Sequence, residues 1–175
     1  MANDIGHMIA ASCELGVSYA ERLLKDVPAK EFARFASPGG QMVTSNHAAF
    51  VLGHLSLYAP RIVEHLGGDM TGIKPPGTFE GLFAKDVTCQ DDPDGTIYPD
   101  QSVIVDTFFR GHRAAIDTLR STGDAVFLEA NPVSGPIRER FPTKGAMHAF
   151  YVGGHLMVHL GQLSAWRRMI GLGAA

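Results

Sequence analysis

The stretch KGAMHAFYVGGHLMVHLGQLSAWRRMIG, residues 144–171, decides the fold class of this 175-residue chain. It holds no Asp, Glu, Lys or Arg between Lys144 and Arg167, and it ends at a glycine. A span of this length could cross a bilayer, but its histidines, glutamine and glycines argue against a membrane position. Because it is apolar on nearly every side, it predicts a helix over residues 144–170 that is buried inside a helical bundle.

Two other stretches have the spacing of amphipathic helices, over residues 4–26 and over residues 99–121. In the first, the stripe expected to face the core consists of Ile5, Ile9, Ser12, Leu15, Tyr19 and Leu23. In the second, it consists of Val105, Phe108, Phe109, His112, Ile116 and Leu119. Pro99 suits the first position of a helix, where a missing backbone N–H leaves no hydrogen bond unmade.

A further helix is predicted over residues 45–66, which begin in a second uncharged stretch. Thr44 or Ser45 is expected to cap its N-terminus, and Gly67 is expected to end it. Pro60 removes one backbone donor inside this span, so we expect a kink or a break in the last turn or two.

Long helices without convincing strands predict an all-α fold, a four-helix bundle forming a single domain over residues 1–175. Residues 67–98 join the second helix to the third. Since bundle neighbours are usually joined by roughly two to eight residues, a link of this length predicts a long crossover. Residues 79–88 are expected to form a short helix within it.

The composition is that of an ordinary soluble globular protein. Hydrophobic residues make up 45% of the chain and charged residues 19%, and the formal net charge is -3. The basic residues are scattered and are not interleaved with aromatics, which excludes a nucleic-acid-binding surface. Cys13 and Cys89 lie far apart outside any CxxC pattern, and the N-terminus lacks a signal-peptide pattern, so reduced thiols in the cytoplasm are expected.

His155 and His159 are four residues apart, which places both imidazoles on one helix face within reach of one ion. Such a pair also arises by chance on a helix face. However, burying two imidazoles without partners would cost about 1–3 kcal/mol each, so a position inside the bundle favours a shared metal ion. Position 156 is leucine, which excludes an HExxH metalloprotease.

A third ligand is expected from the helix over residues 45–66, where His47, His54 and His65 fall on nearly the same face. Residues seven apart are separated by about 10 Å along a helix, so only one of these histidines can join the ion. His54 lies mid-helix and is the third candidate. His47 is expected to hydrogen-bond the start of the helix, and a partial charge on His65 is expected to suit the dipole at its end.

Several other polar residues are weaker candidates for membership of the site. His148 lies about two turns before the histidine pair and is expected to be packed or on the surface. His112 falls in an apolar stripe and is interpreted as a core histidine, with a supporting contact to the site as the alternative. Tyr58 and Tyr151 could border the site, although tyrosines at such positions are more often core residues, and Gln162 could either orient a ligand or serve packing or helix capping.

Three short motifs are distinctive together. They are Asn46-His47 with Gly53-His54-Leu55, HLMVHLGQL at residues 155–163, and WRRMIGL at residues 166–172. This set resembles the DinB/YfiT-like superfamily of bacterial metal-binding bundles, whose pattern is a GHL-type histidine on the second helix and HxxxH followed by GQ on the fourth. The resemblance covers nearly the full chain, and the middle third contributes no motif to it.

The resemblance implies a four-helix bundle in which His54, His155 and His159 hold one divalent metal ion. It also implies a homodimer, since family members are commonly dimers. Some relatives transfer low-molecular-weight thiols such as bacillithiol to electrophiles, a related branch includes mycothiol-dependent maleylpyruvate isomerase, and many have no assigned reaction. A fold alone does not determine an activity.

Three neutral imidazoles leave at least one coordination position open, as in catalytic zinc sites. Zinc or nickel is expected, although nitrogen ligands also suit copper and iron. An open position could hold a water for hydrolysis or a thiol for attack on an electrophile. The leading hypothesis is therefore a metal-dependent enzyme acting on a small molecule, of the thiol S-transferase or hydrolase type. The alternatives are a non-catalytic metal-binding or stress-response protein, and a haem-binding bundle with paired axial histidines.

Overall fold

The computed structural model describes residues 2–175 and is built from helices. The α-helices are α1 (Asp4–Leu24), α2 (Ala48–Ser56), α3 (Ala59–His65), α4 (Phe79–Phe83), α5 (Gln101–Ser121), α6 (Asp124–Leu128), α7 (Pro136–Arg140), α8 (Lys144–Ala149) and α9 (Leu156–Met169). The remaining helical turns are the 3-10 segments η1 (Ala29–Glu31) and η2 (Pro38–Gly40) and the π-helical segment η3 (Phe150–His155). Over residues 2–175 there is no β-strand, only two isolated bridges. The predicted all-α class is confirmed.

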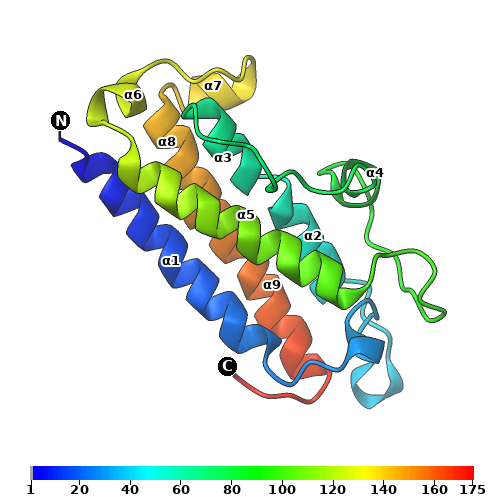
Figure 1. Cartoon of the computed structure of the whole chain (residues 1–175). Coiled ribbons are helices and arrows are strands. Elements are labelled where there is room, and N and C mark those ends of the chain that lie inside the picture. The colour runs from blue at the N-terminus through cyan, green and yellow to red at the C-terminus, as the bar shows by residue number, and fades with distance from the viewer. Residues whose placement is uncertain (1) are drawn as a thin grey trace.

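The long helices pack side by side around a common core (Figure 1). α1 contacts α5 and α9, and α2 contacts α5 and α9 as well. α2, α3 and α5 run in one direction, whereas α1 and α9 run in the other. The chain between α3 and α5, which carries α4, therefore returns along the length of the molecule. Trp166, Phe108 and Leu52 are fully buried between the helices, and each contributes roughly 1.5–3 kcal/mol to the free energy of unfolding by leaving water.

α1 buries Ile9 and Leu23 of the predicted stripe, but the rest of its buried face differs from the prediction. Cys13 and Val17 face the core, whereas Leu15 is 64% exposed. Close backbone packing explains the difference, because a Cβ on Gly16 would lie only 2.4 Å from Leu156 Cδ2 on α9. Small residues line the packed face of α1, so a prediction based on large apolar residues does not identify this face.

α5 follows its prediction more closely. The predicted core residues Phe108, His112, Ile116 and Leu119 are buried, and α5 begins at Gln101, two residues later than expected. The two short helices α6 and α7, which follow α5, were not predicted.

The predicted helix over residues 45–66 is divided in two at Leu57. α2 ends before this residue, and α3 begins after it with Pro60 in its first turn, so the predicted break is confirmed. Gly67 follows α3 with a φ of 74°. This left-handed conformation suits glycine at the end of a helix, as predicted.

The predicted helix over residues 144–170 is present but is not a regular α-helix throughout. Thr143 caps α8 by accepting a hydrogen bond from the Ala146 N–H at 3.2 Å. η3 then forms a wider, π-helical turn before α9 continues. The helix is also not buried on every side, because Met157 is 39% and Val158 63% exposed.

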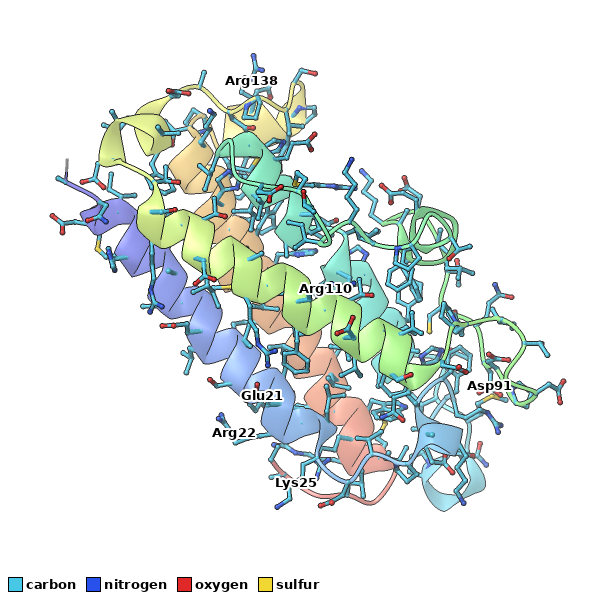
Figure 2. The ribbon with its side chains drawn as sticks, viewed as in Figure 1. Glu21, Arg22, Lys25, Asp91, Arg110 and Arg138 are labelled. Carbon is cyan, nitrogen blue, oxygen red and sulfur yellow. The ribbon has the colours of Figure 1, made fainter. Side chains whose placement is uncertain are left out.

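Among residues 2–175, no helix is long and apolar enough to cross a membrane. Figure 2 shows charged side chains on the outside of the molecule. Glu21, Arg22 and Lys25 project from the end of α1, and Arg110 projects from α5.

Candidate metal centre

His54, His155 and His159 come together between α2 and the η3–α9 segment. One ring nitrogen from each lies within 4.8 Å of the other two. The ring centroids are 5.2 Å apart for His54 and His155, and 4.7 Å apart for each of the other two pairs. The three predicted ligands therefore converge on one point, and rings this close leave no room for a haem plane between them.

The spacing fits a small divalent ion. His54 Nε2 and His155 Nε2 are 3.2 Å apart, and two ligand atoms at tetrahedral angles on zinc, with bonds of 2.0–2.1 Å, would be about 3.3 Å apart. Neutral imidazoles are the donors that zinc and nickel accept. These three residues could therefore hold a metal ion, and the donor set does not select which one.

The orientation of His54 is set by the chain between α3 and α5. Its Nδ1–H donates to the backbone carbonyl of Phe83 at 2.7 Å, which leaves Nε2 without a proton and free to coordinate. Phe83 sits close because position 53 is glycine: a Cβ on Gly53 would lie 2.5–2.6 Å from the Phe83 ring. The glycine of the GHL motif thus admits the residue that orients the histidine beside it.

His159 is oriented by an amide pair. Its Nδ1–H donates to Gln162 Oε1 at 3.0 Å, and the same oxygen accepts a hydrogen bond from Asn46 Nδ2 at 3.0 Å. Of the two roles considered for Gln162, the orienting one is observed. Asn46 also joins the start of α2 to α9 across the site.

His155 lacks such a partner. Its Nδ1 is buried without a hydrogen-bond partner in residues 2–175. The ring is instead enclosed by aromatics, with the Tyr58 centroid 4.3 Å and the Phe150 centroid 5.7 Å away. Packing, rather than a hydrogen bond at Nδ1, orients this side of the ring.

Burial keeps the three imidazoles neutral. It lowers the pKa of His54 and of His159 below the ordinary 6.5, with hydrogen bonding to Phe83 and Gln162 opposing part of the change. Burial, reinforced by the other two histidines, lowers the pKa of His155 to about 3. Neutral rings have the lone pairs that a metal requires.

A cavity of about 800 Å³ opens beside the histidines. Its aromatic walls come from Phe35, Phe50, Tyr58, Phe150 and Tyr151. Its other lining residues are Thr44, Ser45, Asn46, Arg61, Lys85, Val87, Thr88, Cys89, Val133 and Ile137. The sequence did not decide whether Tyr58 and Tyr151 are core residues or site residues. Both border the cavity. Its volume lies within the range of small-molecule sites.

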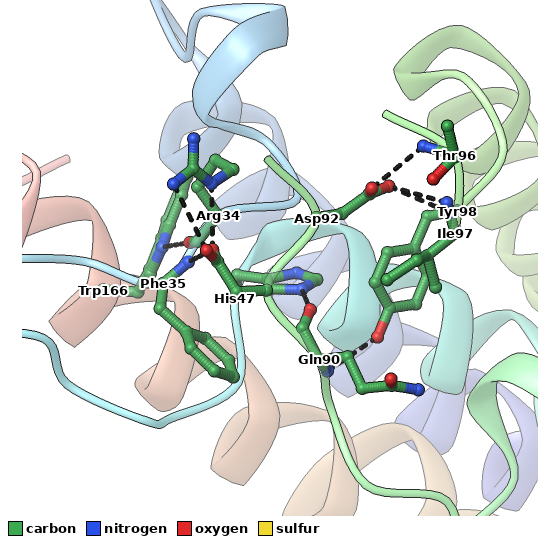
Figure 3. A network of polar contacts seen from close by, with 10 residues as sticks. Arg34, Phe35, His47, Gln90, Asp92, Thr96, Ile97, Tyr98 and Trp166 are labelled. Carbon is green, nitrogen blue, oxygen red and sulfur yellow. Dashed lines mark hydrogen bonds and ion pairs between the residues drawn. The ribbon is translucent and has the colours of Figure 1, made fainter. Parts of the chain in front are cut away.

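A polar network joins His47 and Gln90, the sequence neighbours of the lining residues Asn46 and Cys89 (Figure 3). His47 caps α2, accepting from the Phe50 N–H at 3.2 Å, so the predicted Thr44 or Ser45 cap is wrong. The other ring nitrogen, Nε2, donates to the Gln90 carbonyl at 2.8 Å. His47 therefore ties the start of α2 to the chain that follows α4.

The same stretch is anchored at two further points. Asp91 pairs with Arg34 at 2.9 Å, and this hydrogen bond lowers the pKa of the Asp91 carboxyl. The Arg34 carbonyl in turn accepts from the Trp166 indole N–H at 2.9 Å. Asp92 accepts hydrogen bonds from the backbone N–H groups of Thr96, Ile97 and Tyr98.

His112, His148 and His65 lie apart from the centre. His112 is buried in the core, as interpreted from its stripe, and its Nδ1–H donates to the Phe108 carbonyl at 2.7 Å. His148 is fully buried and faces His65, with ring centroids 5.5 Å apart. Burial lowers the pKa of His65, so the expected partial charge at the helix end is disfavoured.

Comparison of the chain with models of known protein families gives no match, and comparison with curated proteins gives none either.

Proposed function

We propose that this protein is a metal-dependent enzyme acting on a small molecule, of the thiol S-transferase or hydrolase type. The observation that carries the proposal is the convergence of three imidazole nitrogens within 4.8 Å at the wall of a cavity of about 800 Å³. His54, His155 and His159 would hold the ion and leave its remaining positions facing the cavity. A divalent ion there would act as a Lewis acid that acidifies a water or a thiol.

The surrounding residues support a reactive role more than a storage role. Aromatic side chains form much of the cavity wall, and such apolar walls strengthen electrostatic interactions beside them. The Tyr58 and Tyr151 side chains border the same space, and burial raises the pKa of both phenols, so they remain protonated donors. A non-catalytic metal-binding or stress-response protein of the same family needs the histidines but not this cavity.

The sequence motifs and the helix packing together support membership of the DinB/YfiT-like superfamily, with its four-helix bundle, as part of this proposal. GHL and HxxxH-GQ place the three histidines, and the long crossover supplies the Phe83 carbonyl that orients His54. The proposed ion is zinc or nickel.

Metal analysis is the first test. The purified protein is expected to contain about one zinc or nickel per chain, and His54→Ala, His155→Ala and His159→Ala are each expected to lose it. His7→Ala, which changes an exposed histidine on α1, is the matched control and should keep the metal. Unchanged metal content in all three site variants would refute the metal centre.

Turnover is the second test. The metal-loaded protein is mixed with thiols plus an electrophile, and separately with activated esters. A rate that is lost with a chelator and restored by zinc or nickel is expected. If the metal binds but no reaction in either panel depends on it, the non-catalytic alternative replaces the enzyme.

A homodimer is also proposed, through exposed apolar residues of α1 and α9. These helices contact each other, and they expose Met8, Leu15 and Val158 to 67%, 64% and 63%. Val158→Lys is expected to shift the dimer to a monomer in light scattering without loss of metal, whereas Val103→Lys on α5 should not. A monomeric wild-type protein would contradict the proposed dimer.

A further inference from the structure

The charged residues of the cavity all have one sign. Among residues 2–175, only Arg61 and Lys85 contribute charged side chains to its lining, and no carboxylate does so. A bound divalent ion would add two more positive charges, because its three ligands are neutral. Low-dielectric aromatic walls would concentrate this field on whatever enters.

Arg61 lines the cavity beside the candidate metal site. Its guanidinium stands 5.1 Å from the ring of Tyr58, which also lines the cavity. It also pairs with Glu80 at 2.9 Å, but both side chains are well exposed, at 39% and 62%. Such a pair contributes little in water, and Glu80 uses one of several guanidinium donors.

Lys85 is placed by the same segment that orients His54. It follows Phe83, the residue whose carbonyl accepts from His54, by two positions. Among residues 2–175 no carboxylate lies within ion-pair distance of its ammonium. Its charge is thus available to a ligand beside the metal.

The rest of the cavity suits an apolar body. Phe150 and Tyr151 wall one side, together with Val133 and Ile137 from the chain around α7. We infer that the cavity selects small organic anions, binding the apolar body against these side chains and the anionic head group with Arg61 and Lys85. This inference rests on the proposed function of the site. Arg61 and Lys85 would hold the head group, and the ion would stay free to bind the reacting atom.

The test uses ligands that share a body and differ in charge. Zinc-loaded protein is titrated with phenylacetate, benzylphosphonate and neutral phenylacetamide, and binding is followed by NMR. Both anions are expected to bind at least about tenfold more tightly than the amide, as charge-assisted hydrogen bonds predict. The ratio between the two anions distinguishes a carboxylate from a phosphoryl head group.

Variants locate the head group. Arg61→Gln and Lys85→Gln are each expected to weaken anion binding about tenfold and to leave amide binding and zinc content unchanged. Glu80→Gln breaks the same ion pair but keeps the guanidinium, so it should bind the anions at least as tightly as wild type. Lys74→Gln, an exposed lysine outside the cavity lining, should change nothing.

Two results would overturn the inference. One is that the two anions bind no more tightly than the amide, which includes the case in which none of the three ligands binds. The other is anion binding that Arg61→Gln and Lys85→Gln leave intact and His155→Ala abolishes, since the anion would then be a simple metal ligand. Failure of the proposed function is distinguishable: a protein that binds no metal but still prefers the anions, through Arg61 and Lys85, would show anion selection by the cavity without a metal-dependent reaction.

Discussion

Gln162 is the residue whose contribution to the proposed metal centre is most directly testable. Its Oε1 accepts from His159 Nδ1 at 3.0 Å, and loss of a partner behind a metal ligand typically lowers metal affinity about 10–100-fold. Gln162→Ala is therefore expected to weaken zinc binding by this amount in a chelator competition. Gln162→Glu keeps an acceptor and should retain most of the affinity, whereas equal affinities in both variants and wild type would assign Gln162 to packing alone.

Two buried histidines outside the centre predict how stability depends on pH. Burial lowers the pKa of His112 to about 4 and that of His148 to about 3, the latter helped by His65 and Lys144. The unfolded chain protonates these residues near 6.5, while the folded chain does not. Their contribution to stability is therefore complete above about pH 6.5 and is lost as the pH falls toward 4, by about 3 kcal/mol for His112 alone.

His148→Phe tests this reading in urea unfolding of the metal-free protein at several pH values. His148 has two ring nitrogens without partners among the described residues, so an apolar ring should be neutral or stabilising at about pH 7.5. The loss of stability between pH 6.5 and 4 should be smaller than in wild type. Parallel pH curves for the two proteins would show that His148 titrates normally in the fold.

Spacing in the sequence predicted which histidines could share a face, but not everything that positions them. The pair His155 and His159 follows from helical geometry, and His54 was selected by its place in mid-helix. The Phe83 carbonyl that orients His54 has no sequence signature, because every residue carries a backbone carbonyl. The pairing of His65 with His148 was also beyond reach, since it depends on how two helices meet.

At the scale of elements, the close approach of α4 to α2 is the feature that supports the centre. Gly53→Ala would place a Cβ 2.5–2.6 Å from the Phe83 ring. The displaced ring should lower the free energy of unfolding by about 1–3 kcal/mol. Zinc affinity should fall as well, because the Phe83 carbonyl moves away from His54.

Gly161→Ala is the matched control within α9. A Cβ there would meet nothing within 4 Å, and replacing an exposed helical glycine by alanine stabilises by roughly 0.5–1 kcal/mol. Thermal unfolding and chelator competition on both variants provide the measurement. Similar behaviour of the two would mean that Phe83 adapts without affecting the centre.

Helix boundaries set by proline or glycine were predicted correctly, whereas features that depend on packing between helices were predicted poorly. Pro60 and Gly67 placed the break and the end of α3, because their backbone preferences are local. The buried face of α1 was predicted only in part: Ile9 and Leu23 are buried, but Leu15 is exposed, and Gly16 packs closely against α9 because it has no side chain. The π-helical turn of η3 likewise has no residue pattern that predicts it.

At the scale of the whole molecule, metal binding should couple distant parts of the chain. The three ligands come from α2, η3 and α9, so the unfolded chain cannot hold them together. Zinc at a hundredfold excess over its Kd should add about 2.7 kcal/mol to the free energy of unfolding. For a chain of this size that corresponds to an increase in Tm of roughly 5–10 °C.

Calorimetry with and without zinc measures this increase. His155→Ala should abolish it, and His7→Ala should preserve it. An undiminished increase in His155→Ala would place the ion elsewhere.

The π-helical turn of η3 also constrains how this helix can evolve. Since a π turn holds one residue more than the α-helical path it replaces, it corresponds to a single-residue insertion between α8 and α9. Deletion of one residue there would restore a regular helix and rotate α8 against α9, so that α8 packing and the histidine positions could not both be kept. A homologous sequence whose helix is regular throughout should therefore lack one residue relative to this chain. The alignment should show this as a one-residue gap within residues 150–155.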